Sequence, residues 1–160
     1  MKKLLLALCI LSCSSAGIAQ DIKAFSADQV IHYTSSKDTL YIINFWATWC
    51  APCVHELPEF EALYHRYQGK PVKVLMVSLD FKEDYPYKLS VFLKRKGLTP
   101  EVVWMSDTDP NVFIPKIDNS WQGSIPATVI VGPGKDFKQF IEGTITEKQV
   151  SKIVDNVIDK

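Results

Sequence analysis

The feature that most constrains the fold is a strand-like run that leads directly into two cysteines. Residues 40–46 (LYIINFW) are apolar or β-prone, and such a run predicts a strand buried on both faces. Cys50 and Cys53 follow after a short turn and flank an Ala-Pro pair. Apolar residues then recur at helical spacing over 58–67, and Gly69 ends the pattern. We therefore expect the cysteine pair at a strand-to-helix junction.

Strand-like and helix-like patterns alternate along the rest of the chain. Further strands are expected at 72–77, 102–104, 127–131 and 137–142, the last of them antiparallel to the one before. Helices are expected around 89–96 and after Thr146, which forms a capping box with Gln149. Residues 109–120 show no clear pattern. This order predicts an α/β fold with a mixed central β-sheet and helices on both faces.

The N-terminal segment has the parts of a secretory signal peptide. Lys2 and Lys3 give a basic start, residues 4–11 are apolar, and small residues lead up to Ala19. The apolar run is too short to span a bilayer. We expect cleavage near Ala19 or Gln20.

This interpretation divides the chain into a signal peptide, residues 1–19, and a single domain, residues 20–160. The protein is then exported and is periplasmic or associated with the envelope. A second interpretation makes Cys13 the lipid-modified first residue of a lipoprotein, because residues 10–12 loosely resemble a lipoprotein signal. Both interpretations place the cysteine pair outside the cytoplasm.

Charge excludes some classes of partner. The chain has 18 basic and 18 acidic residues, and removal of Lys2 and Lys3 leaves 16 basic against 18 acidic residues. This slight acidity argues against nucleic acid and anionic lipid as the main partner. Removal of the signal also takes away Cys9 and Cys13, so that one thiol pair remains.

The position of the pair indicates redox chemistry rather than a structural clip. A bridge between Cys50 and Cys53 closes so small a loop that it adds little stability. At a helix N-terminus, free amides and the helix dipole stabilise a thiolate on Cys50, and Pro52 fits the first turn. Cys53 lies one turn later on a similar face and can resolve a mixed disulfide on Cys50. The expected reaction is two-electron thiol–disulfide exchange without a cofactor.

Two segments, residues 45–53 (FWATWCAPC) and 123–128 (GSIPAT), resemble the thioredoxin-like proteins, and among them the exported TlpA/ResA type. The resemblance covers nearly the whole chain after the signal. It implies a cis Ile125–Pro126 bond against the cysteine pair, with Ile125 backbone groups available to an extended substrate. Trp49, beside Cys50, is expected to be a partly exposed platform for substrate.

The resemblance also suggests a proton acceptor. Cytoplasmic thioredoxins have a buried aspartate where this chain has Asn44, and a neutral amide cannot take a proton. Proteins of the ResA type carry a glutamate three residues after the second cysteine, and Glu56 occupies that place. Burial would let Glu56 accept the Cys53 proton or tune the Cys50 thiolate. The alternative is an ordinary solvated glutamate.

The resulting hypothesis is an exported protein disulfide reductase. The family resemblance implies that it receives electrons through a membrane-embedded partner. Three alternatives stay open. The same chemistry could run as a thiol oxidase or isomerase, because sequence does not set the reduction potential. A peroxidase would need a peroxide pocket that the sequence does not display. The fold could also serve as a binding module, although two thiolates lack the further ligands of a closed zinc site, and no metal is expected.

Overall fold

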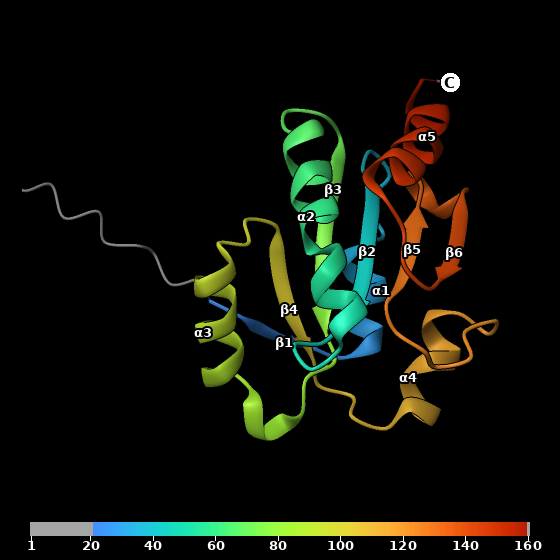
Figure 1. Cartoon of the computed structure of the whole chain (residues 1–160). Coiled ribbons are helices and arrows are strands. Elements are labelled where there is room, and N and C mark those ends of the chain that lie inside the picture. Colours follow the sequence, from blue (N-terminus) through green and yellow to red (C-terminus); the bar gives the residue numbers. More distant parts are fainter. Residues whose placement is uncertain (1–20, 160) are drawn as a thin grey trace, which may run out of the picture.

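A six-stranded sheet forms the centre of the computed structural model, which describes residues 21–159 (Figure 1). The expected signal peptide, with Cys9 and Cys13, lies outside the described residues. The strands, in chain order, are β1 (Lys23–Phe25), β2 (Leu40–Trp46), β3 (Val72–Ser78), β4 (Glu101–Met105), β5 (Ala127–Val131) and β6 (Lys138–Glu142). They lie in the order β1-β4-β3-β2-β5-β6. The first four of these are parallel, whereas β5 is antiparallel to β2 and β6 is antiparallel to β5.

Helices cover both faces of the sheet, which confirms the expected fold class. They are α1 (Ala27–Tyr33), α2 (Ala51–Arg66), α3 (Tyr87–Lys96), α4 (Pro110–Ile117) and α5 (Glu147–Ile158), with short 3-10 turns η1 (Lys82–Asp84) and η2 (Pro133–Lys135). One hydrophobic cluster joins α2, α3 and α5 to one face, and a second cluster joins α1 and α4 to the other. Within residues 21–159, no helix is long and apolar enough to cross a membrane.

Strand β2 is the central element, because all seven of its residues are buried between β3 and β5. Its side chains alternate between the two clusters: Ile42 and Trp46 face α2, while Ile43 and Phe45 face the opposite side. Asn44 shares the α2 face with Ile42 and Trp46. The turn after β2 therefore places the start of α2 at the C-terminal end of a central strand.

Three elements were not predicted from the sequence: β1, α1 and α4. A capping box does begin α1, since Ser26 Oγ accepts from the Gln29 N–H and the Gln29 side chain accepts from the Ser26 N–H. In α4, Asp109 caps the N-terminus and Pro110 occupies the first position, while Pro115 lies inside the helix. An internal proline removes one backbone hydrogen bond of the helix, and this residue obscured the helical pattern in the sequence.

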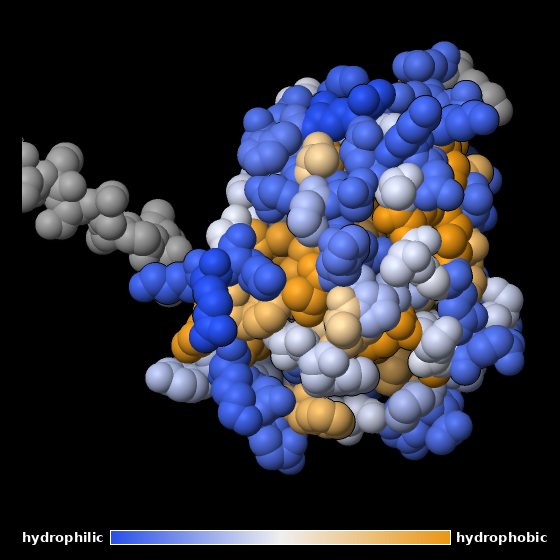
Figure 2. Space-filling model, in the orientation of Figure 1, coloured by the Kyte–Doolittle hydropathy of each residue, from blue (hydrophilic) through white to orange (hydrophobic). Residues whose placement is uncertain are grey.

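The surface is uneven in polarity. Figure 2 shows hydrophilic residues over most of the end that carries the C-terminal helix, while apolar residues reach the surface mainly in the middle and lower part of the view. The exposed large hydrophobic side chains of the described residues include Trp49 in the turn after β2, Phe81 after β3 and Val112 in the first turns of α4. The other two, Tyr87 and Val91, lie on α3, so apolar exposure is found both near the cysteines and on α3.

Candidate redox site

The two cysteines form a disulfide at the start of α2. The sulfur atoms are 2.09 Å apart and the Cα atoms 5.3 Å apart. Cys50 is the N-cap residue of α2, and the Cys53 backbone N–H points at Cys50 Sγ over 3.3 Å. Pro52 lies in the first turn, where a helix does not use the backbone N–H that proline lacks. After reduction, the same N–H and the helix dipole would stabilise a thiolate on Cys50.

The two sulfur-bearing residues differ in access. Cys50 is 6% exposed, whereas Cys53 is completely buried. An incoming thiolate or disulfide can therefore reach Cys50 and is kept from Cys53. Access and the helix N-terminus both favour Cys50 as the reacting sulfur.

Trp49 and Ile125 are neighbours of Cys50, the first in the chain and the second in space. Trp49 is 53% exposed and stacks on Phe81, with ring centroids 5.7 Å apart. The Ile125 carbonyl oxygen is 3.7 Å from Cys50 Sγ. The Ile125–Pro126 peptide bond is cis, and so is the Tyr85–Pro86 bond, which was not anticipated. A backbone carbonyl and an exposed aromatic ring are thus close to Cys50.

The loop before Ile125 is held by Glu142 at the end of β6. The Glu142 carboxylate accepts hydrogen bonds from the backbone N–H groups of Ser124, at 2.9 Å, and Gln122, at 3.1 Å. The Ser124 hydroxyl also donates to it, and together these bonds hold the pKa of Glu142 below its ordinary value. No sequence pattern pointed to Glu142, because its partners are 18 and 20 residues away.

Glu56 is buried, not solvated, with 3% of its surface exposed. Its Oε1 accepts a hydrogen bond from Asn44 Nδ2 at 3.0 Å, and its Oε2 accepts one from the Ile145 N–H at 3.0 Å. Burial raises the pKa of Glu56 to about 7, although these two hydrogen bonds act to lower it. A carboxyl group of this kind changes its proton state near neutral pH.

Asn44 connects Glu56 to the neighbouring strand. Its Nδ2 also donates to Thr128 Oγ1 on β5 at 3.2 Å. Its Oδ1 is buried without a hydrogen-bond partner among the described residues, and so is the indole nitrogen of Trp46. Both atoms belong to β2 residues that face α2, so the least satisfied polar groups of the core lie on the face that carries the disulfide.

Asp80 was missed by the sequence analysis. It is 3% exposed, and its carboxylate accepts hydrogen bonds from the Thr48 N–H at 3.0 Å and the Ser78 hydroxyl at 2.7 Å. The Trp104 indole N–H donates to the Asp80 backbone carbonyl at 2.8 Å. Asp80 thereby ties the turn before Cys50 to β3 and β4. An acidic residue just after a buried strand was the available signal.

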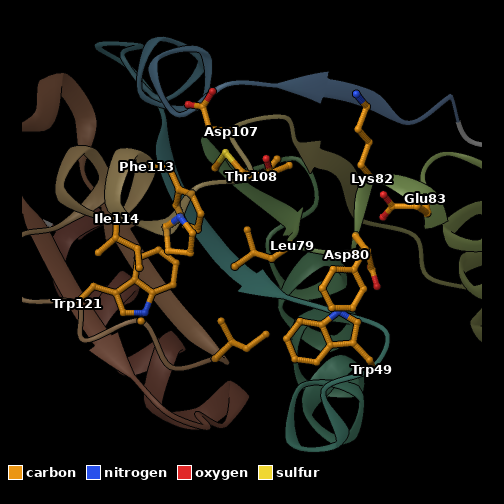
Figure 3. A pocket seen from close by; sticks show the side chains of 15 residues that line it. Trp49, Leu79, Asp80, Lys82, Glu83, Asp107, Thr108, Phe113, Ile114 and Trp121 are labelled. Carbon is orange, nitrogen blue, oxygen red and sulfur yellow. The ribbon is translucent and has the colours of Figure 1, made fainter.

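A groove of about 430 Å³ opens beside Trp49 and Ile125 (Figure 3). In Figure 3, Trp121, Phe113 and Ile114 lie on one side of the groove and Trp49 on the other, with Leu79 between them. The disulfide and an apolar recess are therefore neighbours. Among residues 21–159, no group of three or more His, Cys, Asp or Glu side chains is placed to hold a metal ion.

Known proteins of similar sequence include thiol-disulfide oxidoreductases, which agrees with a redox-active cysteine pair. Residues 17–136 match the AhpC/TSA family. A thiol-disulfide oxidoreductase ResA from Geobacillus kaustophilus is 32% identical over 118 residues, which are 72% of this chain and 61% of that protein. A sporulation thiol-disulfide oxidoreductase A from Bacillus subtilis is 36% identical over 68 residues, which are 42% of this chain and 41% of that protein. The chain thus spans less than two thirds of these curated relatives.

Solved structures show the same fold. The chain is similar to StoA from Bacillus subtilis, with a TM-score of 0.60 and 25% identity over 74% of this chain and 84% of that chain. A thioredoxin-related protein from Neisseria meningitidis serogroup B gives a TM-score of 0.66 and 27% identity over 79% of this chain and 90% of that chain. These likenesses confirm the thioredoxin-like fold.

Proposed function

The chain belongs to the AhpC/TSA family, and from this membership and the site geometry we propose that it is a thiol–disulfide oxidoreductase that reduces disulfides in protein clients. One observation carries the proposal: a Cys50–Cys53 disulfide at a helix N-terminus, with Cys50 accessible and Cys53 buried. The two relatives named above, both thiol-disulfide oxidoreductases, support the same chemistry.

In the first step, the Cys50 thiolate attacks one sulfur of a client disulfide. A Cys50–client disulfide forms, and the other client sulfur leaves as a thiolate. The Cys53 N–H, aimed at Cys50 Sγ, stabilises the attacking thiolate. Trp49, Ile125 and cis Pro126 are the surfaces against which we expect the client segment to lie.

In the second step, Cys53 loses its proton and attacks Cys50 Sγ. The Cys50–Cys53 disulfide re-forms, the client is released as a dithiol, and this protein has given up two electrons. We assign the proton to the Glu56 carboxylate, one helical turn beyond Cys53, with Asn44 supporting that carboxylate through its amide. A donor dithiol then reduces the enzyme, and we propose a membrane-embedded protein for that role.

Export is part of the same proposal. The basic start, short apolar run and small residues of 1–19 support a signal peptide, which leaves residues 20–160 as one domain in the periplasm or envelope. Mass spectrometry of the protein purified from an exporting host tests this. A mature N-terminus near Gln20 supports a cleaved signal, whereas a diacylated Cys13 would make the protein a lipoprotein.

The reduction potential of the Cys50–Cys53 pair tests the direction of the reaction. The protein is equilibrated in defined thiol–disulfide buffers, and its redox state is measured by alkylation and mass. A value near or below that of thioredoxin, about −270 mV, is expected for a reductase. A value nearer −120 mV would reverse the assignment to an oxidase or isomerase, and a pair that never exchanged would make the protein a binding module.

A further inference from the structure

Two adjacent residues at the end of β6 hold both chain neighbours of Ile125. The Glu142 carboxylate accepts a hydrogen bond from the Ser124 N–H at 2.9 Å, and the Gly143 N–H donates to the Pro126 carbonyl at 2.8 Å. The strand β6 ends near the segment between α4 and β5 (Figure 1). Because Ser124 and Pro126 are both held, the direction of the Ile125 carbonyl between them is held as well.

The Glu142 carboxylate lies in a cradle of donors from one loop. Its Oε2 accepts from the Gln122 N–H at 3.1 Å, and its Oε1 accepts from the N–H and the hydroxyl of Ser124. Gly123 has a φ of 94°, which turns the chain so that the N–H groups on either side of it converge on one carboxylate. Glu142 is in no ion pair among residues 21–159, so these hydrogen bonds are what balances its charge there.

The other side of Ser124 is held by Trp121. The Trp121 indole N–H donates to the Ser124 carbonyl at 2.8 Å, and the ring is buried against Phe45 and Phe113. Ser124 is therefore tied to the core through its carbonyl and to β6 through its N–H and hydroxyl. Removal of the Glu142 carboxylate leaves the tie to the core, so the loop should shift without unfolding.

Two backbone groups of opposite polarity lie beside Cys50 Sγ. The Cys53 N–H, at 3.3 Å, stabilises a thiolate on the reduced protein. The Ile125 carbonyl oxygen, at 3.7 Å, does the opposite, because it can accept a hydrogen bond from a thiol and repels a thiolate. A thiolate that is stabilised less makes the disulfide harder to reduce, which lowers the reduction potential. The position of this carbonyl therefore affects the direction of exchange.

We propose that Glu142 is a positioning residue of the redox site: by holding Gln122 and Ser124 it keeps the Ile125 carbonyl against Cys50 Sγ, and it thereby keeps the cysteine pair reducing. The inference rests on the proposed function of the same site and adds a residue on β6 to it. Glu142 takes part in no step of the exchange and acts through Ile125.

The test measures how readily Cys50 ionises. In protein that carries Cys53→Ala, alkylation of Cys50 by iodoacetamide is followed by mass spectrometry against pH, which gives the pH at which half of Cys50 is a thiolate. Glu142→Ala, which releases the loop, should lower this midpoint by about half a pH unit. Glu56, which titrates near neutral pH, is present in both proteins and contributes equally. With both cysteines present, Glu142→Ala should shift the equilibrium with glutathione toward the dithiol by up to about threefold.

Matched variants separate the position of the loop from the charge of Glu142. Glu142→Asp keeps the charge but is one methylene shorter, so it should lose part of the cradle and shift the midpoint in the same direction by a smaller amount. Ser124→Ala removes only the hydroxyl donor, and a small shift there keeps the test decisive if Glu142→Ala does not fold. Asp159→Asn removes an exposed carboxylate at the end of α5 and should shift nothing. The shift in Glu142→Ala should persist in 1 M salt, where the direct effect of a distant charge is screened.

The outcomes separate this inference from the proposed function. An unchanged or raised midpoint in Glu142→Ala overturns the role of Glu142, and so does a shift that is absent from Glu142→Asp and vanishes in 1 M salt. In both cases the proposed function stands if the wild type reduces the disulfide of mercaptoethanol. If the wild type fails to reduce it, the proposed function falls, while the midpoint still decides whether Glu142 positions the carbonyl beside Cys50.

Discussion

The two ends of α2 are built from different kinds of interaction. At the C-terminal end, Arg66 Nη2 donates to Asp155 Oδ2 and the Tyr67 hydroxyl donates to Asp155 Oδ1, both over 2.8 Å. Burial, followed by the hydrogen bond to Asp155, raises the pKa of Tyr67 above its ordinary value. At the N-terminal end, an aromatic ring is exposed, a carboxyl group is buried, and Asn44 Oδ1 has no partner among the described residues.

The difference indicates that one end of α2 contributes mainly to stability and the other end to reactivity. At the C-terminal end, polar side chains of α2 are hydrogen-bonded to α5, which stabilises the fold. The N-terminal end keeps groups that a stability-driven design would avoid: exposed Trp49 and buried, titrating Glu56. Changes at the two ends should therefore affect different measurements.

The largest effect is expected at the disulfide. Cys50→Ala should abolish turnover, whereas Cys53→Ala should still attack clients and then stop as a mixed disulfide on Cys50. Non-reducing gels and mass spectrometry of the trapped species check this. Mixed disulfides that form through Cys53 in Cys50→Ala would contradict the assigned roles, since Cys53 is fully buried in the structure.

The next effect is expected at Glu56. Glu56→Gln keeps the volume but removes the proton acceptor, so the resolving attack of Cys53 should slow about a hundredfold above pH 7. Stopped-flow measurement of the resolving step against pH checks it: the wild-type rate should rise with a midpoint near 7. Glu61→Gln is the control on the same helix, because Glu61 is not among the groups that shift the pKa of Glu56. A midpoint that survives Glu56→Gln would exclude Glu56 as the acceptor.

Glu56 also makes stability depend on pH. Its folded pKa of about 7 lies above the ordinary 4.5, so the folded state holds a proton that the unfolded state has released between these values. The free energy of unfolding should therefore fall as pH rises from about 4.5 to 7, by at most about 3 kcal/mol from this group. Urea unfolding across this range should lose that slope in Glu56→Gln. An unchanged slope would mean that other groups cause it.

A smaller effect is expected at Asp80. Asp80→Asn replaces charge-assisted hydrogen bonds to Thr48 and Ser78 with weaker ones and should lower the free energy of unfolding by about 2 kcal/mol. Client exchange should slow a few-fold, because the turn before Cys50 loses its anchor. Urea unfolding checks the first, and the rate at which the reduced protein cleaves a disulfide-linked peptide dimer checks the second. Ser78→Ala, which removes one donor, is the control and should lose less stability.

The smallest effect is expected at the C-terminal end of α2. Tyr67→Phe removes the hydroxyl that donates to Asp155 and should cost about 1 kcal/mol in the free energy of unfolding. The reduction potential of the Cys50–Cys53 pair should not change. A shifted potential in Tyr67→Phe would show that the two ends of α2 are coupled.

Much of the fold was accessible from sequence. Periodicity predicted β2 at residues 40–46 and β5 at 127–131 with their observed bounds, and a capping box predicted the start of α5 at Thr146. The short β1 escaped because three residues with a charged start carry no readable alternation. Such an edge strand forms through pairing with β4, which is a tertiary interaction.

The site likewise has a part that the sequence predicted and a part that it did not. Cys50, Cys53 and Glu56 lie close in sequence, so helix geometry and family resemblance could bring them together. The groove could not be foreseen, because it is assembled from the ends of β3 and β4, from α4 and from the loop before β5. Asp80 and Glu142 act through hydrogen bonds to residues up to 32 positions away, and no local pattern records such distances.

Because the Ile145 N–H donates a hydrogen bond to Glu56 Oε2, this backbone amide is a natural NMR probe of the redox site. Its nitrogen and proton resonances should follow the charge of Glu56 directly, without a probe attached near the sulfurs. Because Ile145 directly precedes the N-cap of α5, the signal comes from a position outside the helix that carries the cysteines. The chemical shift of this one amide would therefore report, in solution and in each redox state, whether Glu56 is protonated.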